Sequence, residues 1–181
     1  MYNRNAISRD APGVETLGCS QINGSDKTGT LTQNNMTVVE QYGEGEKLLA
    51  QCMALCTDVS VDHDGNLVGE PTEAALVAYA MTLGLNKNDM LATAPRVGEA
   101  PFDSSRKMMS TIHKTADGVL QFTKGAPDVV LGHCTHIFKN GESVPMTEAD
   151  REAVLAANKA FADRALRALA GAFRTPAPVP A

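Results

Sequence analysis

Two short extended runs joined by a tight turn constrain this chain most strongly. Residues Lys107 to His113 and Val119 to Thr123 are rich in apolar and β-branched side chains, and Asp117-Gly118 lies between them. An Asp-Gly pair favours a turn with positive φ angles, which places its two flanking strands side by side in antiparallel order. The sequence therefore predicts a β-hairpin in the middle of the chain.

Helices are predicted on both sides of this hairpin. Lys47 to Thr57 is helical by composition, and Pro71, at a first-turn position, opens a second helix that Gly84 can close. Pro127 starts a short helix that runs to Leu131. Because helices and strands alternate in this way, the pattern indicates a mixed α/β fold.

The last helical pattern has a clear start and an uncertain end. Thr147 to Asp150 resembles a capping box, with Asp in place of the usual Glu or Gln. Apolar residues then recur at helical spacing as far as Leu169, so periodicity alone predicts one helix from Glu148 to about Ala170.

Length and charge exclude some classes of protein. The 181 residues suffice for one domain, or for one domain and part of another. The net charge of −5 and the lack of a Lys/Arg cluster argue against nucleic acid as a partner. The longest nearly apolar stretch, 74–85, is shorter than the roughly 20 residues that cross a bilayer. Residues 1–5 lack the apolar core of a signal peptide, so we expect a cytosolic chain.

The segment with the most chemistry begins at Asp26. This carboxylate is followed at once by Lys27 and Thr28, and then by Gly29 and further Thr residues. Covalent phosphoryl transfer needs a nucleophile, a nearby cation and small residues whose backbone can approach phosphate oxygens. An isolated Asp-Lys pair would more often mark a Gly/Thr-rich turn. The longer pattern favours Asp26, Lys27 and Thr28 as catalytic residues.

The run 26–32, Asp-Lys-Thr-Gly-Thr-Leu-Thr, resembles the phosphorylation signature of P-type cation-transporting ATPases, in which the Asp becomes an aspartyl phosphate. Its flanks are similar to those of type II members such as calcium pumps. The resemblance implies a nucleotide-binding domain, an antiparallel sheet flanked by helices, inserted into a haloacid-dehalogenase-like phosphorylation domain. The expected organisation is phosphorylation domain and hinge over 1–42, nucleotide-binding domain over 43–172, and a returning hinge or cut end over 173–181.

Two further segments resemble nucleotide-binding motifs of this family. Glu73 matches the helix-start Glu that contacts the adenine amino group, although the helix dipole favours an acid in a first turn anyway. Phe102 matches the Phe that stacks on adenine, and Lys107 and Met109 match residues that line the same pocket. A Phe beside a strand is more often part of a core, so the binding interpretation depends on the motifs occurring together.

Two later motifs extend the resemblance. Lys124 and Gly125 match a Lys-Gly-Ala-Pro-Glu element, in which a cation enters the site and the missing side chain leaves room for nucleotide. An unpaired surface Lys is the plainer alternative. Arg167 matches the Arg of the family's closing strand, which reaches the nucleotide phosphates. We therefore predict that the last helix stops near Arg164 and that Leu166 to Ala170 is extended, against the periodicity.

The family uses Mg²⁺ with ATP, and the resemblance assigns the metal to Asp26 and the Thr28 carbonyl. The motifs that complete that site in the family do not occur in the chain, and two ligands alone hold Mg²⁺ poorly. The strand before Asp26 is unusually polar, and Ser104 replaces a basic residue found in calcium pumps. We expect this chain to bind ATP without turning it over appreciably.

The leading hypothesis is a cytosolic, monomeric fragment of an integral membrane ATPase that presents ATP to Asp26 and drives the transport of a cation, with calcium favoured by similarity. Its expected partners are ATP and the rest of the pump: the second half of the phosphorylation domain, the actuator domain and the membrane helices. Two alternatives stay open. One is an aspartate-nucleophile phosphatase or phosphomutase, although Thr28 stands where such enzymes usually carry an acid. The other is a non-catalytic interaction module.

Overall fold

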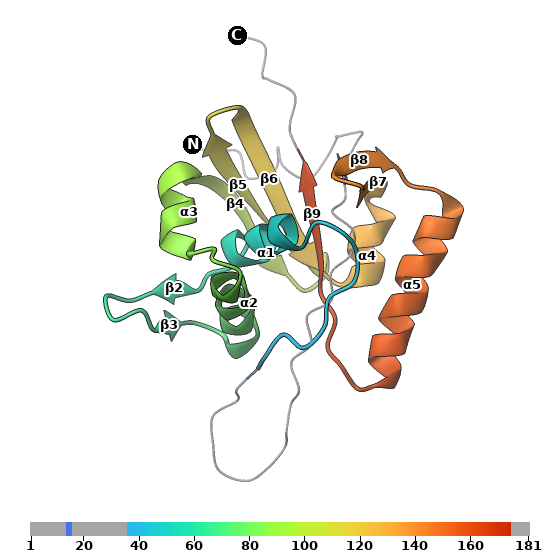
Figure 1. The fold of residues 1–181 in the computed structure, drawn as a ribbon, viewed down its shortest axis with the longest axis horizontal. Helices are drawn as coiled ribbons and strands as arrows, with labels where there is room; N and C mark the ends of the chain where they lie inside the picture. The colour runs from blue at the N-terminus through green and yellow to red at the C-terminus, as the bar shows by residue number, and fades with distance from the viewer. Residues whose placement is uncertain (1–13, 16–35, 175–181) are drawn as a thin grey trace.

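A computed structural model describes residues 14–15 and 36–174 (Figure 1). The helices of this part are α1 (Glu46–Leu55), α2 (Pro71–Thr82), α3 (Lys87–Thr93), α4 (Pro127–Gly132) and α5 (Glu148–Asp163). The strands are β1 (Val14–Glu15), β2 (Ser60–Val61), β3 (Leu67–Val68), β4 (Arg96–Asp103), β5 (Met108–Thr115), β6 (Gly118–Gly125), β7 (Cys134–Lys139), β8 (Glu142–Pro145) and β9 (Ala170–Arg174).

One seven-stranded sheet, in the order β4-β5-β6-β9-β1-β7-β8, forms the centre of the molecule. All its neighbouring strands are antiparallel except the pair β1 and β7. The predicted hairpin is confirmed, because β5 and β6 pair from Met108 opposite Gly125 to Thr115 opposite Gly118. A separate two-stranded ladder joins β2 to β3. The expected mixed fold, an antiparallel sheet flanked by helices, is confirmed.

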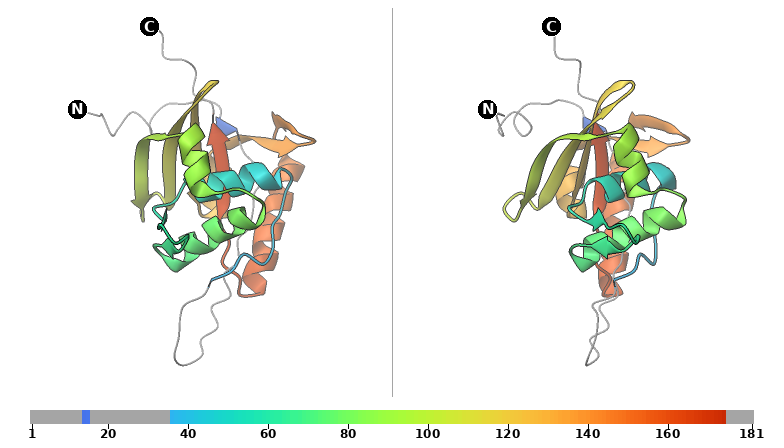
Figure 2. Two further views of the ribbon diagram at one scale, coloured as in Figure 1. Left: turned by 60° about the vertical axis from the view of Figure 1, so that its left-hand side comes forward. Right: turned by 90° about the vertical axis from the view of Figure 1, so that its left-hand side faces the viewer.

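Helices cover both faces of the sheet at β9, where the two main groups of buried side chains meet. A Cβ on Gly171 would lie 3.0–3.1 Å from side-chain atoms of Leu49, Cys52 and Met53 on α1. Ala170 and Ala172 instead belong to the core cluster that contains residues of α4 and α5. Figure 2 shows α1 and α4 on opposite sides of the sheet. Small side chains in β9 therefore allow helices to approach from both sides.

The predicted helix ends follow local capping chemistry. Pro71 occupies the first turn of α2, and Gly84 follows its end with φ +80°. The capping box of α5 is confirmed: the Thr147 hydroxyl accepts a hydrogen bond from the Asp150 N–H, and the Asp150 carboxylate accepts one from the Thr147 N–H. These interactions satisfy backbone groups that a helix end leaves unpaired.

The end of α5 supports the family resemblance over the periodicity, with one correction. The helix stops at Asp163, and Ala165 has φ +56°. The closing strand, however, begins at Ala170, where it pairs with Gly125, and not at Leu166 as predicted. A hydrogen bond from the Leu166 N–H to the Phe161 carbonyl turns the chain first. Residues 166–169 therefore lead to the sheet without joining a ladder.

Some features of the described chain had no counterpart in the sequence prediction. The Asn86 side chain accepts hydrogen bonds from the N–H groups of Asn88 and Asp89 and so caps α3. The β2–β3 hairpin is held by Asp62, whose Oδ1 accepts from two backbone N–H groups in the turn. The backbone of β1 lies between β9 and β7, and β9 continues to Arg174.

The expected domain boundaries, after residues 42 and 172, remain a prediction.

Acid should weaken the start of α5. Lys139 contacts Asp150 and, with the Thr147 N–H, lowers the pKa of that carboxyl to about 2 from 3.8. The native protein therefore binds fewer protons here than the unfolded chain, so this stabilisation is present above about pH 4 and is lost as the pH falls towards 2. We expect Asp150→Asn to lower the melting temperature at pH 7, and the difference from wild type to shrink between pH 4 and pH 2.

Asp117→Asn is the matched control, because it changes an exposed acid and keeps a residue that suits the turn. Its melting temperature should follow that of wild type at every pH. A difference for Asp150→Asn that stays constant down to pH 2 would contradict the assignment.

Candidate functional site

A cavity of about 410 Å³ opens where α2, the β4–β6 hairpins and the segment before β9 meet. Six of the seven residues predicted to bind nucleotide line it; Lys107 does not. Its lining consists of Glu70, Thr72, Glu73, Phe102, Met109, Lys124, Gly125, Arg167 and Leu169. Residues from four separate motifs thus share one cavity, while their role in binding stays a prediction.

Strand register explains much of this convergence. Met109 on β5 lies opposite Lys124 on β6, and Gly125 lies opposite Ala170 at the start of β9. Because β9 begins at that point, the preceding residues Arg167 and Leu169 reach the rim of the same cavity. The sheet therefore fixes the relative positions of residues that are far apart in the sequence.

An ion pair lies inside the cavity. Lys124 Nζ is 2.7 Å from Glu73 Oε1, and the two side chains are only 7% and 20% exposed. The other carboxylate oxygen, Glu73 Oε2, accepts a hydrogen bond of 3.2 Å from the Asp58 N–H. A partly buried pair needs such additional hydrogen bonds to offset the lost hydration. The site thus presents an acid and a cation in a fixed arrangement.

The start of α2 holds this acid in place. Glu70 is the N-cap residue, and its carboxylate accepts a hydrogen bond of 3.1 Å from the Glu73 N–H. The carboxylate of Glu73 lies in the first helical turn, where the helix dipole stabilises negative charge. Glu70 was not predicted as a lining residue, although an acid directly before a Pro at a helix start is a recognisable capping signal.

An exposed aromatic ring and a buried thioether border the same cavity. Phe102, near the end of β4, is 63% exposed, whereas Met109 is almost fully buried. Leaving a Phe ring this accessible forgoes the free energy that burying it would provide. The arrangement offers a flat apolar surface at the cavity and a deeper apolar contact, which suits a planar ligand.

The remaining predicted residues differ in their placement. Lys107 lies in the β4–β5 turn with φ +56°, and its side chain is exposed. Asp103 closes this turn by accepting hydrogen bonds from the N–H groups of Ser105 and Arg106. The Lys107 carbonyl accepts a hydrogen bond from the Ala126 N–H, so the Lys107 backbone contacts the chain directly after Gly125. Lys107 therefore lies in the hairpin turn and not in a continuous strand, and it is not among the lining residues.

Two lining residues were missed by sequence reasoning besides Glu70. Thr72 accepts a hydrogen bond of 3.4 Å from Arg167 Nη1, which ties the closing segment to the start of α2. Leu169 belongs to the apolar pattern that periodicity assigned to the last helix. Neither position carries a local signal for a site.

The predicted phosphoryl-transfer and metal residues Asp26, Lys27 and Thr28 lie outside the described residues. In residues 14–15 and 36–174, no group of three or more His, Cys, Asp or Glu side chains could hold a metal ion. No helix in the same part of the chain is long and apolar enough to span a bilayer.

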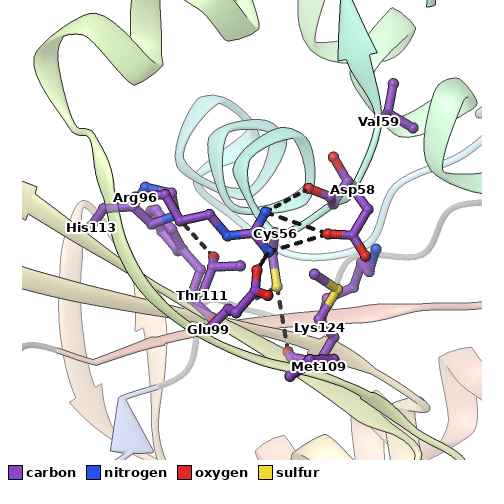
Figure 3. A network of polar contacts seen from close by, with 12 residues as sticks. Cys56, Asp58, Val59, Arg96, Glu99, Met109, Thr111, His113 and Lys124 are labelled. Atoms are coloured by element: carbon purple, nitrogen blue, oxygen red, sulfur yellow. Dashed lines mark hydrogen bonds and ion pairs between the residues drawn. The ribbon is translucent and has the colours of Figure 1, made fainter. Parts of the chain in front are cut away.

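Figure 3 shows a network of polar contacts that includes the lining residues Met109 and Lys124. Arg96 forms ion pairs with Asp58 and Glu99, at 3.4 and 2.9 Å. The buried His113 contacts the Ala94 carbonyl through Nδ1 and the Thr111 hydroxyl through Nε2, both at 2.9 Å. Burial lowers the pKa of His113, so the neutral ring donates from Nδ1, because a carbonyl can only accept.

Comparison with known proteins places this fold and cavity in a family. Residues 46–178 match the model of the P-type ATPase cytoplasmic domain N. The chain belongs to the P-type ATPase family. All residues that line the cavity fall within the part that matches domain N.

Relatives of this P-type ATPase chain are named as calcium transporters. The chain is 42% identical to Calcium-transporting ATPase 1 of Lactococcus lactis, 40% to a calcium-transporting ATPase of Listeria monocytogenes, and 42% to Calcium-transporting ATPase 1 of Bacillus cereus. Each match covers 96% of this chain but only 21%, 22% and 21% of the relative. The chain thus spans about a fifth of the length of these proteins.

Proposed function

We propose that domain N of this chain binds ATP in the 410 Å³ cavity. The observation that carries the proposal is the convergence of Glu73, Phe102, Lys124 and Arg167 from separate motifs on one cavity. A concave site with apolar walls and a few placed charges is the usual form of a small-molecule site.

The chemistry of the lining suits an adenine nucleotide. The accessible ring of Phe102 would stack on the base, and the Glu73 carboxylate would accept a hydrogen bond from the exocyclic amino group. Met109 supplies an apolar contact deeper in the cavity. Lys124 is held by Glu73, so it acts close to the base, whereas the exposed Arg167 at the rim is the better placed cation for phosphates.

In the whole pump, ATP would supply the phosphoryl group that Asp26 accepts, with Mg²⁺ held by Asp26 and the Thr28 carbonyl, and the cycle would drive cation transport. Calcium is the proposed ion, because the relatives are named for it. The proposed partners are the second half of the phosphorylation domain, the actuator domain and the membrane helices of the same protein, of which this chain would be a cytosolic part.

An ATP titration of the 181-residue chain, followed by chemical-shift mapping, tests the proposal. We expect a dissociation constant of about 0.1–1 mM, or roughly −4 to −5.5 kcal/mol. Shifts should concentrate on the residues of the cavity, with Val119, near the start of β6 and not in the cavity lining, as an unaffected reference. Absence of saturable shifts, or shifts centred away from the cavity, would favour the interaction-module alternative.

Turnover should be absent from the chain by itself. We expect no stoichiometric label when it is incubated with γ-labelled ATP and Mg²⁺, and no hydrolysis of a generic phosphate ester. Asp26→Asn, which lacks the nucleophile, sets the background for both assays. An acid-stable, hydroxylamine-labile label on the wild-type chain would contradict the expectation, and ester hydrolysis that depends on Asp26 would favour the phosphatase alternative.

A further inference from the structure

Lys87 is a buried lysine that does not line the cavity described above. It is the first residue of α3 and only 6% exposed. Its Nζ donates hydrogen bonds to the Thr57 carbonyl at 3.2 Å, the Thr57 hydroxyl at 2.7 Å and the Val59 carbonyl at 2.5 Å. Burying an ammonium group is costly unless its donors are satisfied. Here all three protons go to one short turn, residues 57–59.

The position of this turn connects Lys87 to Glu73 in the cavity. Residues 57–59 follow the C-terminal end of α1, where a cation is stabilised by the helix dipole. The two carbonyl groups that Lys87 holds belong to the residues on either side of Asp58. The Thr57 carbonyl and the Asp58 N–H belong to one planar peptide unit, so holding the carbonyl also fixes the direction of the N–H. The bond to the Val59 carbonyl holds the other end of the turn.

That N–H is the link to the cavity. It donates to Glu73 Oε2 at 3.2 Å, while Lys124 holds Glu73 Oε1 at 2.7 Å. The two donors approach different oxygens of one carboxylate and so fix its rotation. On the other side, Arg96 holds the Asp58 carboxylate, as Figure 3 shows. If the turn is not fixed, the Glu73 carboxylate keeps only one of these two hydrogen bonds, the one from Lys124.

We propose that Lys87 is a positioning residue for the nucleotide cavity, which acts by holding the Asp58 N–H against the Glu73 carboxylate. The inference rests on the proposed function, because the geometry of Glu73 matters to ligand binding only if the cavity binds the base. Lys87 makes no contact with the ligand in this proposal. It does not line that cavity but a second one, of about 260 Å³, which residues 57–59 also line.

A double-mutant cycle separates positioning from a merely structural role. Lys87→Met removes the charge and keeps the length of the side chain. We expect it to weaken ATP affinity by about three- to tenfold, the effect of losing one ordinary hydrogen bond. In a Glu73→Gln background the same change should alter affinity by less than about twofold, because coupled residues are not additive. Lys159→Met, an exposed lysine on α5, is the matched control.

Equal losses in both backgrounds, or no loss from Lys87→Met, would overturn the proposal. If wild type itself does not bind ATP, the proposed function fails, and the positioning is then judged in the free protein. There, Lys87→Met should shift the Asp58 amide resonance and the Glu73 carboxyl resonance, and Lys159→Met should shift neither. Unmoved resonances would contradict the link between Lys87 and Glu73.

A pH series provides a readout that needs no Lys87 variant, in case Lys87→Met does not fold. Burial and the nearby Arg96 lower the pKa of Lys87 to about 8 from 10.5. The charge of Lys124 also lowers this pKa, whereas the carboxylates of Glu73 and Asp58 raise it. As the pH rises through this value, Lys87 loses its charge and its hold on the turn weakens. ATP affinity should then fall about two- to fivefold between pH 7 and 9.

The midpoint of that fall should coincide with the titration of the Lys87 side chain, followed by its own carbon resonance. Glu73→Gln should remove most of the fall. An affinity that does not change as Lys87 titrates would overturn the proposal.

Discussion

Replacing Phe102 with alanine weakens ATP affinity by about five- to a hundredfold in our expectation, since base–aromatic stacking contributes roughly 1–3 kcal/mol per base. The ring is 63% exposed, so it contributes little to the core. The free energy of unfolding should therefore change by no more than about 0.5 kcal/mol. A titration and a urea unfolding curve on the same preparation would check both expectations.

Val97→Ala is the matched control for Phe102. Val97 lies on the same strand, is 49% exposed and does not line the cavity. Its removal should leave ATP affinity unchanged. If Phe102→Ala binds ATP like wild type, the ring does not stack on the base; if it unfolds more easily by several kcal/mol, the ring has a structural role that its exposure does not indicate.

We expect Gly125→Ala to destabilise the protein more than the addition of a methyl group at any other position of the cavity lining. A Cβ on Gly125 would lie 2.4 Å from the Lys107 carbonyl oxygen and 2.9 Å from the Met108 Cα. Both are backbone atoms of the paired strand and its turn, so they cannot move aside as the end of a side chain would. We expect the free energy of unfolding to fall by about 1–3 kcal/mol, the usual cost of overpacking.

Gly132→Ala is the control for this substitution. No atom lies within 4 Å of a Cβ at Gly132, in the last turn of α4, so Ala should be neutral or slightly stabilising. Urea unfolding of the two variants measures the contrast. Equal stabilities would show that β5 and β6 can separate enough to accept the methyl group. From the sequence, Gly125 was predicted to leave room for nucleotide. The nearby backbone atoms of Lys107 and Met108 require Gly at this position whether or not a ligand binds.

Much of the fold was predictable because its signals are local. The Asp117-Gly118 turn, the first-turn Pro71 and the Thr147 capping box each depend on contacts within a few residues. The candidate site was predictable only through resemblance. A first-turn Glu or a Phe beside a strand has ordinary structural explanations when it stands alone, and the motifs became informative because several occurred together in one chain.

The structure differs from the sequence prediction at two turns of the chain. Lys107 was predicted to begin a strand, but Asp103 closes a turn that contains it, and Lys107 is not among the residues that line the cavity. Residues 166–169 keep a helical period, yet the turn at Ala165 ends α5 and directs them to the site. At the first place a short turn joins the neighbouring strands β4 and β5. At the second place the distant pairing of β9 with β6 determines where the chain joins the sheet.

The sequence by itself determined the starts of α1, α2, α4 and α5, the central hairpin and the family to which the chain belongs, because each depends on neighbouring residues or on a motif that can be compared directly. Only the tertiary structure decided which side chains share a cavity. Lys124 and Glu73 are 51 residues apart and meet because α2 packs on α1, which in turn packs on β6 and β9 of the sheet. Lys87 reaches the same acid through the backbone of a turn 28–30 residues earlier. Such contacts arise from strand register and helix packing, which no local pattern records.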